Sequence, residues 1–388
     1  MPQQRGGGMS RRAALLLVGG ALAQLSLPRV PPPLDLPVGQ AGSAKLGSAR
    51  LDALLAAHAG ALREGELAPL ELAELGYRAT SWDADSVLAE LDYRLSGIDE
   101  YPAVLQRRLT LAEGAVTGES SAPNTAAAPW DLGPLRPVHG ARCLVLGPAA
   151  QDELTALAAT GDRAVSAVSA VWGSGWTERL LLQLPAGEDQ FAQLLGVDPG
   201  TYQGIAAVTS AAAGAPLHTP ADRVLVNPEA FRQLSAVGKQ VVVTHESTHV
   251  ATRADTHPWT PLWLSEGVAD WTGYLDTGRT ARQIAPELTQ DVAAGKLPGA
   301  LPADSDFTAG AEGIAQAYEL SWLACDLIAQ RHGRPALVDL YRAVGAAGPG
   351  AGRDQQLDQV FRQRLGYGLT EFSKDWIAHT ERQLSPQA

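Results

Sequence analysis

Three residues between positions 241 and 250 could do chemistry together. His245 and His249 stand four residues apart, and Glu246 directly follows the first histidine. On a helix, residues i and i+4 differ by about 40° in azimuth, so both imidazoles would project from one face and could hold one Zn²⁺. Glu246 would lie about 100° round from His245, where a carboxylate can take a proton from a water molecule on the ion. A pattern of this kind arises by chance in roughly one chain of this length in a hundred.

Two further carboxylates lie in the apolar segment 261–271, which is predicted to be a helix. Glu266 and Asp270 stand four residues apart on one stripe of it. A buried helix rarely keeps two carboxylates on one stripe unless each has a partner. Both side chains are therefore expected to meet partners in the fold.

The two segments together resemble the gluzincin metallopeptidases, the thermolysin and aminopeptidase group with its peptidase-MA-like relatives. That group combines HExxH with a glutamate on the next helix, often within a Trp-Leu-x-Glu-Gly-x-Ala pattern, which this chain carries at 263–269. The resemblance is specific over about 227–270 and looser over about 140–375. The sixteen residues 250–265 between the second histidine and the glutamate differ a little from the aminopeptidase spacing, which leaves the subfamily open.

The resemblance implies a role for each of these residues. His245, His249 and Glu266 would bind Zn²⁺, and Glu246 would activate the water that attacks a peptide bond. Asp270 would accept a hydrogen bond from the other ring nitrogen of His245. The implied activity is zinc-dependent peptide hydrolysis.

A rival third ligand, Asp255, stands six residues after His249, where a metzincin-like site would place it. That class requires glycine where Thr252 stands, and a methionine turn beneath the metal. The chain has only two methionines, Met1 and Met9, both in the N-terminal leader. These departures favour Glu266 over Asp255.

Two other elements gain a meaning from the resemblance. Gluzincins use a tyrosine or histidine of a later helix to stabilise the oxyanion, and Tyr318, near the start of a helix predicted to run to about Arg331, matches it in chain order. They also pair the substrate backbone with a strand before the HExxH helix, for which 223–227 is the candidate. A core tyrosine and an ordinary interior strand remain the alternatives.

The expected fold class is α+β, a small sheet followed by a helical half that carries HExxH. Short apolar strands are predicted at 143–146, 179–184, 204–208 and 223–227, with a helix at 151–172 that Gly161 interrupts. Mainly helical patterns follow to the end of the chain. Residues 137–388 are therefore expected to form the gluzincin-like domain.

A smaller α+β domain is expected at 44–136. Apolar residues at helical spacing in 48–74 predict one or two helices, broken near Gly65, and partial alternation at 92–95 and 106–111 predicts half-exposed strands. Helix followed by strands resembles the nuclear-transport-factor-2-like fold. The composition break at 115–130, rich in Ser, Ala, Pro and Gly, places the boundary at about residue 137.

The N-terminal residues predict export. Arg11 and Arg12 precede an apolar run that ends at Leu27 and is shorter than the roughly 18 residues of a membrane span. We interpret 1–27 as a cleavable signal peptide, whose paired arginines resemble a twin-arginine signal, and 28–43 as a Pro-rich linker. The expected location is secreted or in the cell envelope, with no stable membrane span after cleavage.

Composition excludes other classes of protein. The chain of 388 residues is 45% hydrophobic, which excludes disorder as its main state, and its net charge of -12 without a basic block excludes nucleic acid as a partner. The two cysteines, Cys143 and Cys325, are too few for a disulfide scaffold, and their pairing is left open, as is the oligomeric state. The expected partner is a peptide or protein substrate. A non-catalytic zinc-containing envelope binding protein and a zinc hydrolase of a non-peptide amide are the alternatives.

Overall fold

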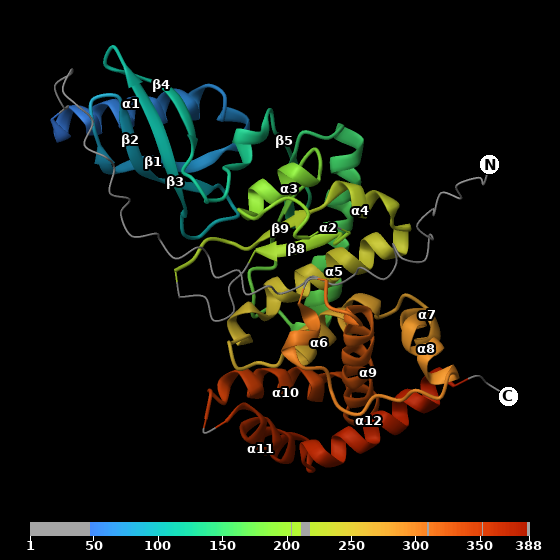
Figure 1. The fold of residues 1–388 in the computed structure, drawn as a ribbon. Coiled ribbons are helices and arrows are strands. Elements are labelled where there is room, and N and C mark those ends of the chain that lie inside the picture. Colours follow the sequence, from blue (N-terminus) through green and yellow to red (C-terminus); the bar gives the residue numbers. More distant parts are fainter. Residues whose placement is uncertain (1–46, 203, 211–217, 309, 351, 386–388) are drawn as a thin grey trace, which may run out of the picture.

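The computed structural model describes residues 47–202, 204–210, 218–308, 310–350 and 352–385. The expected signal peptide at 1–27 and the linker at 28–43 lie outside these residues. Within them the fold is mixed α+β, with two separate sheets and many helices (Figure 1). No helix of the described part of the chain is both long and apolar enough to cross a bilayer.

One helix and a four-stranded antiparallel meander form the N-terminal unit. The elements are α1 (Ser48–Glu64), β1 (Leu72–Trp82), β2 (Ser86–Leu95), β3 (Ala103–Ala112) and β4 (Ala115–Ser121), and the strand order is β1-β2-β3-β4. Every second residue of β2 is buried, because successive side chains of a strand point to opposite faces. α1 covers the sheet through Leu51 and Leu55, which pack against Val87 and Leu109. The helix predicted over 48–74 stops at Glu64, where Gly65 caps it, and a short 3-10 turn at Ala68–Leu70 leads into β1.

The second sheet has five short strands with a parallel centre. They are β5 (Arg136–His139), β6 (Cys143–Gly147), β7 (Leu180–Gln183), β8 (Ala207–Ser210) and β9 (Arg223–Val226), in the order β5-β6-β7-β9-β8. β6, β7 and β9 run parallel, while β5 and β8 are antiparallel edges. The central strands are buried throughout, which explains why they read as apolar runs without alternation.

The strand predicted at 223–227 is present as β9 and lies inside the sheet, which is the ordinary interior strand left open as an alternative, while β8 forms the outer edge among the described strands. One prediction for this region was wrong, the interruption of the helix at Gly161. The helix α2 (Gln151–Trp172) runs without interruption through Gly161. A side chain at Gly161 would meet Leu182 Cδ1 at 2.8 Å, so this glycine allows close contact between α2 and the sheet instead of breaking the helix.

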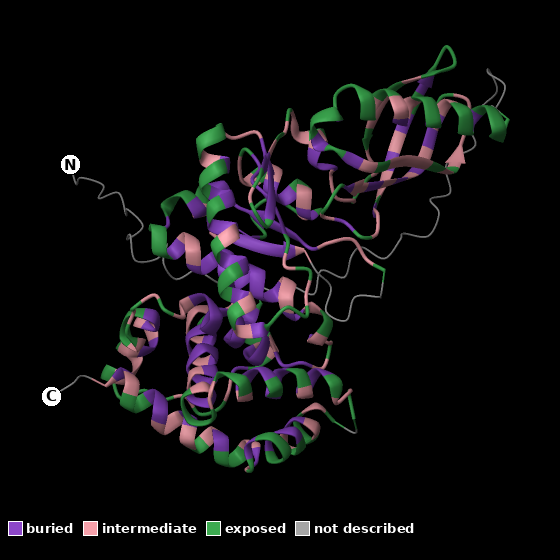
Figure 2. Ribbon diagram, turned by 180° about the vertical axis from the view of Figure 1, so that it is seen from behind, coloured by how far each residue is buried: buried purple, intermediate pink, exposed green. Residues whose placement is uncertain are grey.

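Helices make up the rest of the chain. They are α3 (Glu188–Leu195), α4 (Pro228–Gln233), α5 (Ala236–Thr252), α6 (Leu262–Tyr274), α7 (Ala281–Ile284), α8 (Pro286–Ala293), α9 (Ile314–His332), α10 (Arg334–Ala346), α11 (Arg353–Leu365) and α12 (Leu369–Leu384). α5 and α6 lie between the second sheet and the C-terminal helices (Figure 1). Figure 2 shows the consequence: α5, α6 and α9 are mostly buried, whereas α10, α11 and α12 expose their outer faces.

The two cysteines lie in different parts of the core, Cys143 on β6 and Cys325 on α9. Both are buried and neither forms a disulfide in the described structure.

Candidate metal centre

The HExxH residues lie on α5, which begins at a well-formed cap. The Ser235 hydroxyl accepts a hydrogen bond from Gly238 N at 3.1 Å, and the helix ends at Thr252. Every residue from Val241 to His249 is buried, because α2 and the sheet cover one side of α5 and α6 covers the other. A helix covered on all sides can hold polar side chains only where they meet partners.

Three ligand atoms meet between α5 and α6. His245 Nε2 and His249 Nε2 are 3.0 Å apart. Glu266 Oε2, from α6, lies 3.3 Å from His245 Nε2 and 3.5 Å from His249 Nε2. Tetrahedral Zn²⁺ with bonds of about 2.05 Å separates its ligand atoms by about 3.3 Å. Among the described residues these three form the group of His, Cys, Asp and Glu side chains that could hold a metal ion.

The carboxylate of Glu266 gives a second test of the fit. The residue is fully buried, and within the described structure neither carboxylate oxygen has a hydrogen-bond partner. An unpaired buried carboxylate is costly, and a cation bound between it and the two imidazoles would remove that cost. Burial acts to raise the pKa of Glu266, but the imidazoles of His249 and His245 outweigh it and lower that pKa. The donor set of two nitrogens and one oxygen suits zinc.

The second carboxylate of α6 orients the first histidine. Asp270 Oδ1 lies 2.8 Å from His245 Nδ1, and both side chains are buried. In the neutral ring with Asp270 as acceptor, Nδ1 carries the hydrogen, so Nε2 is left with its lone pair facing the other two ligand atoms. Burial acts to lower the pKa of His245, but the hydrogen bond to Asp270 and the neighbouring carboxylate of Glu266 outweigh it and raise that pKa.

Glu246 is 1% exposed and has a partner that sequence reasoning missed. The Thr209 hydroxyl, on the edge strand β8, lies 2.6 Å from Glu246 Oε2 and 3.2 Å from the Glu246 carbonyl oxygen. No motif surrounds Thr209. Only the order of strands in the sheet brings it to the HExxH helix.

Tyr318, on α9, faces the same centre. Its ring centroid lies 6.4 Å from that of His245, and Phe307 packs edge-on against it at 5.2 Å. Burial, together with the negative charges of Glu266, Asp270 and Glu246, raises the pKa of Tyr318 well above its ordinary value. The phenol therefore stays neutral and can donate a hydrogen bond.

The rival ligand lies elsewhere. Asp255 forms an ion pair with Arg342 at 3.3 Å, and its side chain is 34% exposed. It does not belong to the group of atoms that meet at the centre.

Segment 219–223 lies between the N-terminal unit and the end of α5, and ion pairs and hydrogen bonds hold it from both sides. Asp99, in the turn after β2, pairs with Arg223 at 2.7 Å, and its side chain is fully buried. Asp99 Oδ1 also accepts a hydrogen bond from Ala221 N at 3.0 Å. Arg253, just after α5, holds the segment from the other side through Asp222 at 2.5 Å and the Thr219 hydroxyl at 2.7 Å.

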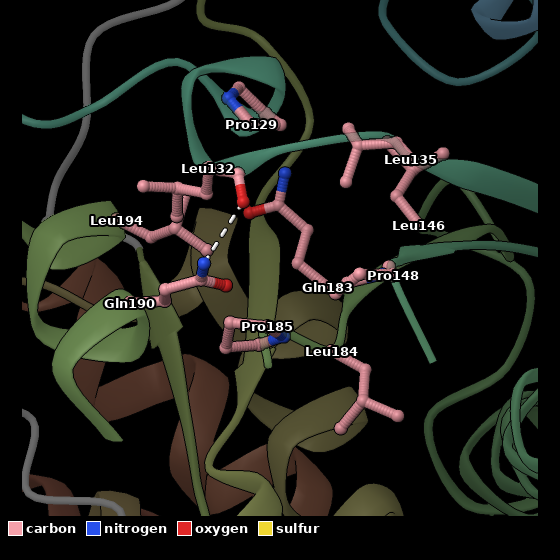
Figure 3. Close-up of a pocket in the computed structure, with 11 residues that line it drawn as sticks. Pro129, Leu132, Leu135, Leu146, Pro148, Gln183, Leu184, Pro185, Gln190 and Leu194 are labelled. Atoms are coloured by element: carbon pink, nitrogen blue, oxygen red, sulfur yellow. Dashed lines mark hydrogen bonds between the residues drawn. The ribbon is translucent and has the colours of Figure 1, made fainter. Parts of the chain in front are cut away.

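A separate cavity lies at the carboxyl ends of β6 and β7 (Figure 3). Parallel sheets often bind ligands at this end. Here the ends are covered by α3 and the turn at 129–132, where Gln190 Nε2 donates a hydrogen bond to the Leu132 carbonyl oxygen at 2.9 Å. The cavity of about 10 Å³ has room for one water molecule, so it is no substrate site.

Comparison with known proteins assigns no family. No family model matches the sequence, and no curated protein is a significant match. Six chains of solved structures match, among them a mutant of a two-domain M1 zinc metallopeptidase bound to L-arginine. That alignment has a TM-score of 0.34 and 15% identity, and it covers 66% of this chain and 52% of the other. The chain thus spans about half the length of that metallopeptidase chain.

Proposed function

We propose that this protein is a zinc-dependent metallopeptidase. The observation that carries the proposal is the mutual spacing of three buried ligand atoms on His245, His249 and Glu266, which suits a tetrahedral zinc site with an open fourth position. A purely structural zinc is usually closed by a fourth protein ligand, and the described residues supply three. The carboxylate of Glu246, next to His245 in the chain, supports catalysis over a structural role.

The residues around the centre suggest a separate role for each in the reaction. Zn²⁺, when bound, lowers the pKa of a water molecule and polarises a carbonyl group. Glu246 would take the proton of the attacking water and pass it to the leaving amine. Tyr318 would donate a hydrogen bond to the oxyanion, a contribution of about 3 kcal/mol at comparable sites. Asp270 would hold the His245 ring in the orientation that turns Nε2 to the centre.

Strand β8 supports an extended peptide as the substrate. Among the residues that the structure describes, it pairs with β9 alone and forms the outer strand of the sheet, and it packs against α5. An open strand edge can pair with the backbone of an added chain, which recognises a peptide without regard to most of its side chains. We therefore propose a peptide or protein substrate that pairs with β8, in place of the strand at 223–227 that the sequence favoured.

The location is a proposal from the sequence alone. The paired arginines and the apolar run within 1–27 support export, so we propose that the enzyme is secreted or held in the cell envelope. Substrates would then be peptides outside the cytoplasmic membrane.

Mass spectrometry of a casein digest incubated with the purified, zinc-loaded protein tests the proposal, with Glu246→Gln beside it. We expect cleavage by the wild type, none by Glu246→Gln, and equal zinc contents, since Glu246 is not a ligand. Tyr318→Phe should reduce cleavage about 100-fold or more and leave zinc unchanged. If zinc is bound and the wild type and Glu246→Gln behave alike, the peptidase proposal is wrong and the binding-protein alternative gains.

A further inference from the structure

We propose that Thr209 is a positioning residue that fixes the carboxylate of Glu246 from the edge strand β8. This inference rests on the proposed function, in which Glu246 carries the proton. The inference gives the Thr209 hydroxyl, which belongs to no recognised motif, a part in this proton transfer.

The contact has the geometry of a charge-assisted hydrogen bond. Thr209 Oγ1 lies 2.6 Å from Glu246 Oε2, and the two residues are 4% and 1% exposed. Hydroxyl-to-carboxylate bonds of this kind are about 2.5–2.7 Å long and about twice as strong as neutral ones. A hydroxyl has one hydrogen to give, so the carboxylate takes it and the longer 3.2 Å contact with the backbone carbonyl of Glu246 is secondary. This bond fixes the orientation of the carboxylate and leaves both lone pairs of Oε1 available for the proton.

The strand makes the hydroxyl a fixed donor. Threonine is branched at Cβ, so few rotamers are open to it in a strand. The β8–β9 pair is itself anchored: Thr209 is in register with Val224, and Ser210 Oγ accepts a hydrogen bond from Arg223 N at 3.3 Å. Arg223 is in turn held by Asp99 of the N-terminal unit. A rigid strand thus sets the position of one carboxylate oxygen.

This placement links the proposed substrate edge to the base. The same strand whose outer edge would pair with the peptide backbone carries the donor that orients Glu246. The distance between the scissile carbonyl and the proton acceptor is then fixed by one strand, β8. Misplacing a catalytic group by about 1 Å can cost about 100-fold in rate.

The kinetic test compares Thr209→Val, Thr209→Ser and the control Thr160→Val on one peptide that the wild type cleaves in a casein digest. Thr160 is a buried threonine of α2, and the described partners of its hydroxyl are Ala156 O and the Arg163 guanidinium, both of α2. We expect Thr209→Val to lower kcat about 10- to 100-fold, with KM within about threefold of the wild type and one zinc per chain retained. Thr209→Ser should recover most of the loss, and Thr160→Val should match the wild type. A kcat of Thr209→Val equal to that of Thr160→Val overturns the proposal.

A second test needs no activity. Melting temperatures are measured for the wild type, Thr209→Val, Glu246→Ala and the double variant. We expect Thr209→Val to lower the melting temperature in the wild type and to change it much less in the Glu246→Ala background, because the carboxylate is then gone. Equal shifts in both backgrounds would mean that the two side chains do not interact.

The two tests separate the failure of this inference from that of the proposed function. If the wild type and Glu246→Gln both leave the casein digest uncut, the peptidase proposal fails and the positioning role falls with it. If only the wild type cuts, Thr209→Val alone decides the role of Thr209.

Discussion

At the scale of single residues, the centre is built from groups that are costly to bury unless they are satisfied. Two imidazole nitrogens and one carboxylate oxygen face each other at 3.0–3.5 Å, and all three side chains are buried. Asp270 makes one hydrogen bond with His245, and Thr209 makes one with Glu246. The oxygens of Glu266 have no hydrogen-bond partner among the described residues, as expected of a ligand that a cation would satisfy.

The ligand assignment predicts opposite results for two acidic residues. Glu266→Ala should weaken zinc binding by more than the roughly 10- to 100-fold that loss of an outer hydrogen-bond partner costs, because it removes a direct ligand. Asp255→Ala should leave zinc binding unchanged, since that carboxylate pairs with Arg342 at the surface. Competition with a fluorescent zinc chelator measures both affinities. Tight zinc binding by Glu266→Ala would contradict the assignment.

At the scale of elements, α6 positions the site because glycines let it pack closely on both sides. A side chain at Gly267 would meet the Ser321 carbonyl oxygen of α9 at 2.6 Å, and one at Gly273 would meet the Val241 carbonyl oxygen of α5 at 3.0 Å. α6 is therefore held between the helix of the histidines and the helix of Tyr318. Gly267 is the glycine that follows the glutamate in the 263–269 pattern. In this structure it is required because any side chain there would collide with the backbone of α9.

The close packing predicts a cost for one added methyl group. Gly267→Ala should lower the free energy of unfolding by about 1–3 kcal/mol, because backbone atoms of α9 must shift. Gly60→Ala is the matched control: Gly60 lies in α1 four residues before its end, and its added methyl group would meet nothing within 4 Å, so the change should stabilise by about 0.5–1 kcal/mol. Urea unfolding monitored by circular dichroism measures both. A Gly267→Ala protein as stable as the wild type would show that α6 and α9 can separate freely.

What could be predicted from sequence follows from how local each feature is. His245, His249, Glu266 and Asp270 lie on two helices, where a period of 3.6 residues and a known pattern indicate which side chains share a face. The buried strands at 143–146 and 179–184 read directly as apolar runs and correspond to β6 and β7. The edge position of β8 could not be predicted, because strand order depends on pairing between distant segments. Thr209 was missed for that reason.

At the scale of the whole molecule, a buried ion pair ties the two sheets together. Asp99 and Arg223 are 124 residues apart in sequence, and their side chains are 0% and 10% exposed. The Tyr93 ring adds a cation-π contact, with its centroid 5.7 Å from the Arg223 guanidinium. Because Arg223 is in β9, beside β8, the N-terminal unit supports the strand next to the one that carries Thr209.

Removing one partner of this pair should be costly. Asp99→Ala is expected to lower the free energy of unfolding by about 3–5 kcal/mol, since Arg223 would be left as an uncompensated buried charge. Asp339→Ala removes an ion pair with Arg364 at the surface, where the Asp339 and Arg364 side chains are 56% and 46% exposed. The free energy of unfolding should therefore fall by about 1 kcal/mol or less. Urea unfolding of both variants gives the comparison. Equal losses would mean that the buried pair adds no more than a surface one.

The same pair limits how far this protein can be treated as a set of modules. The composition break at 115–130 invites a cut there, yet a fragment that begins at 137 would bring Arg223 without the turn at 95–99 that neutralises it. Transplanting the catalytic half onto another protein would have to carry that turn along. After a nick in the connecting segment, we expect the two pieces to stay associated through this ion pair and through the apolar cluster that Tyr93 shares with Leu144 and Leu181. The boundary visible in the sequence is therefore not a line along which the protein can be separated.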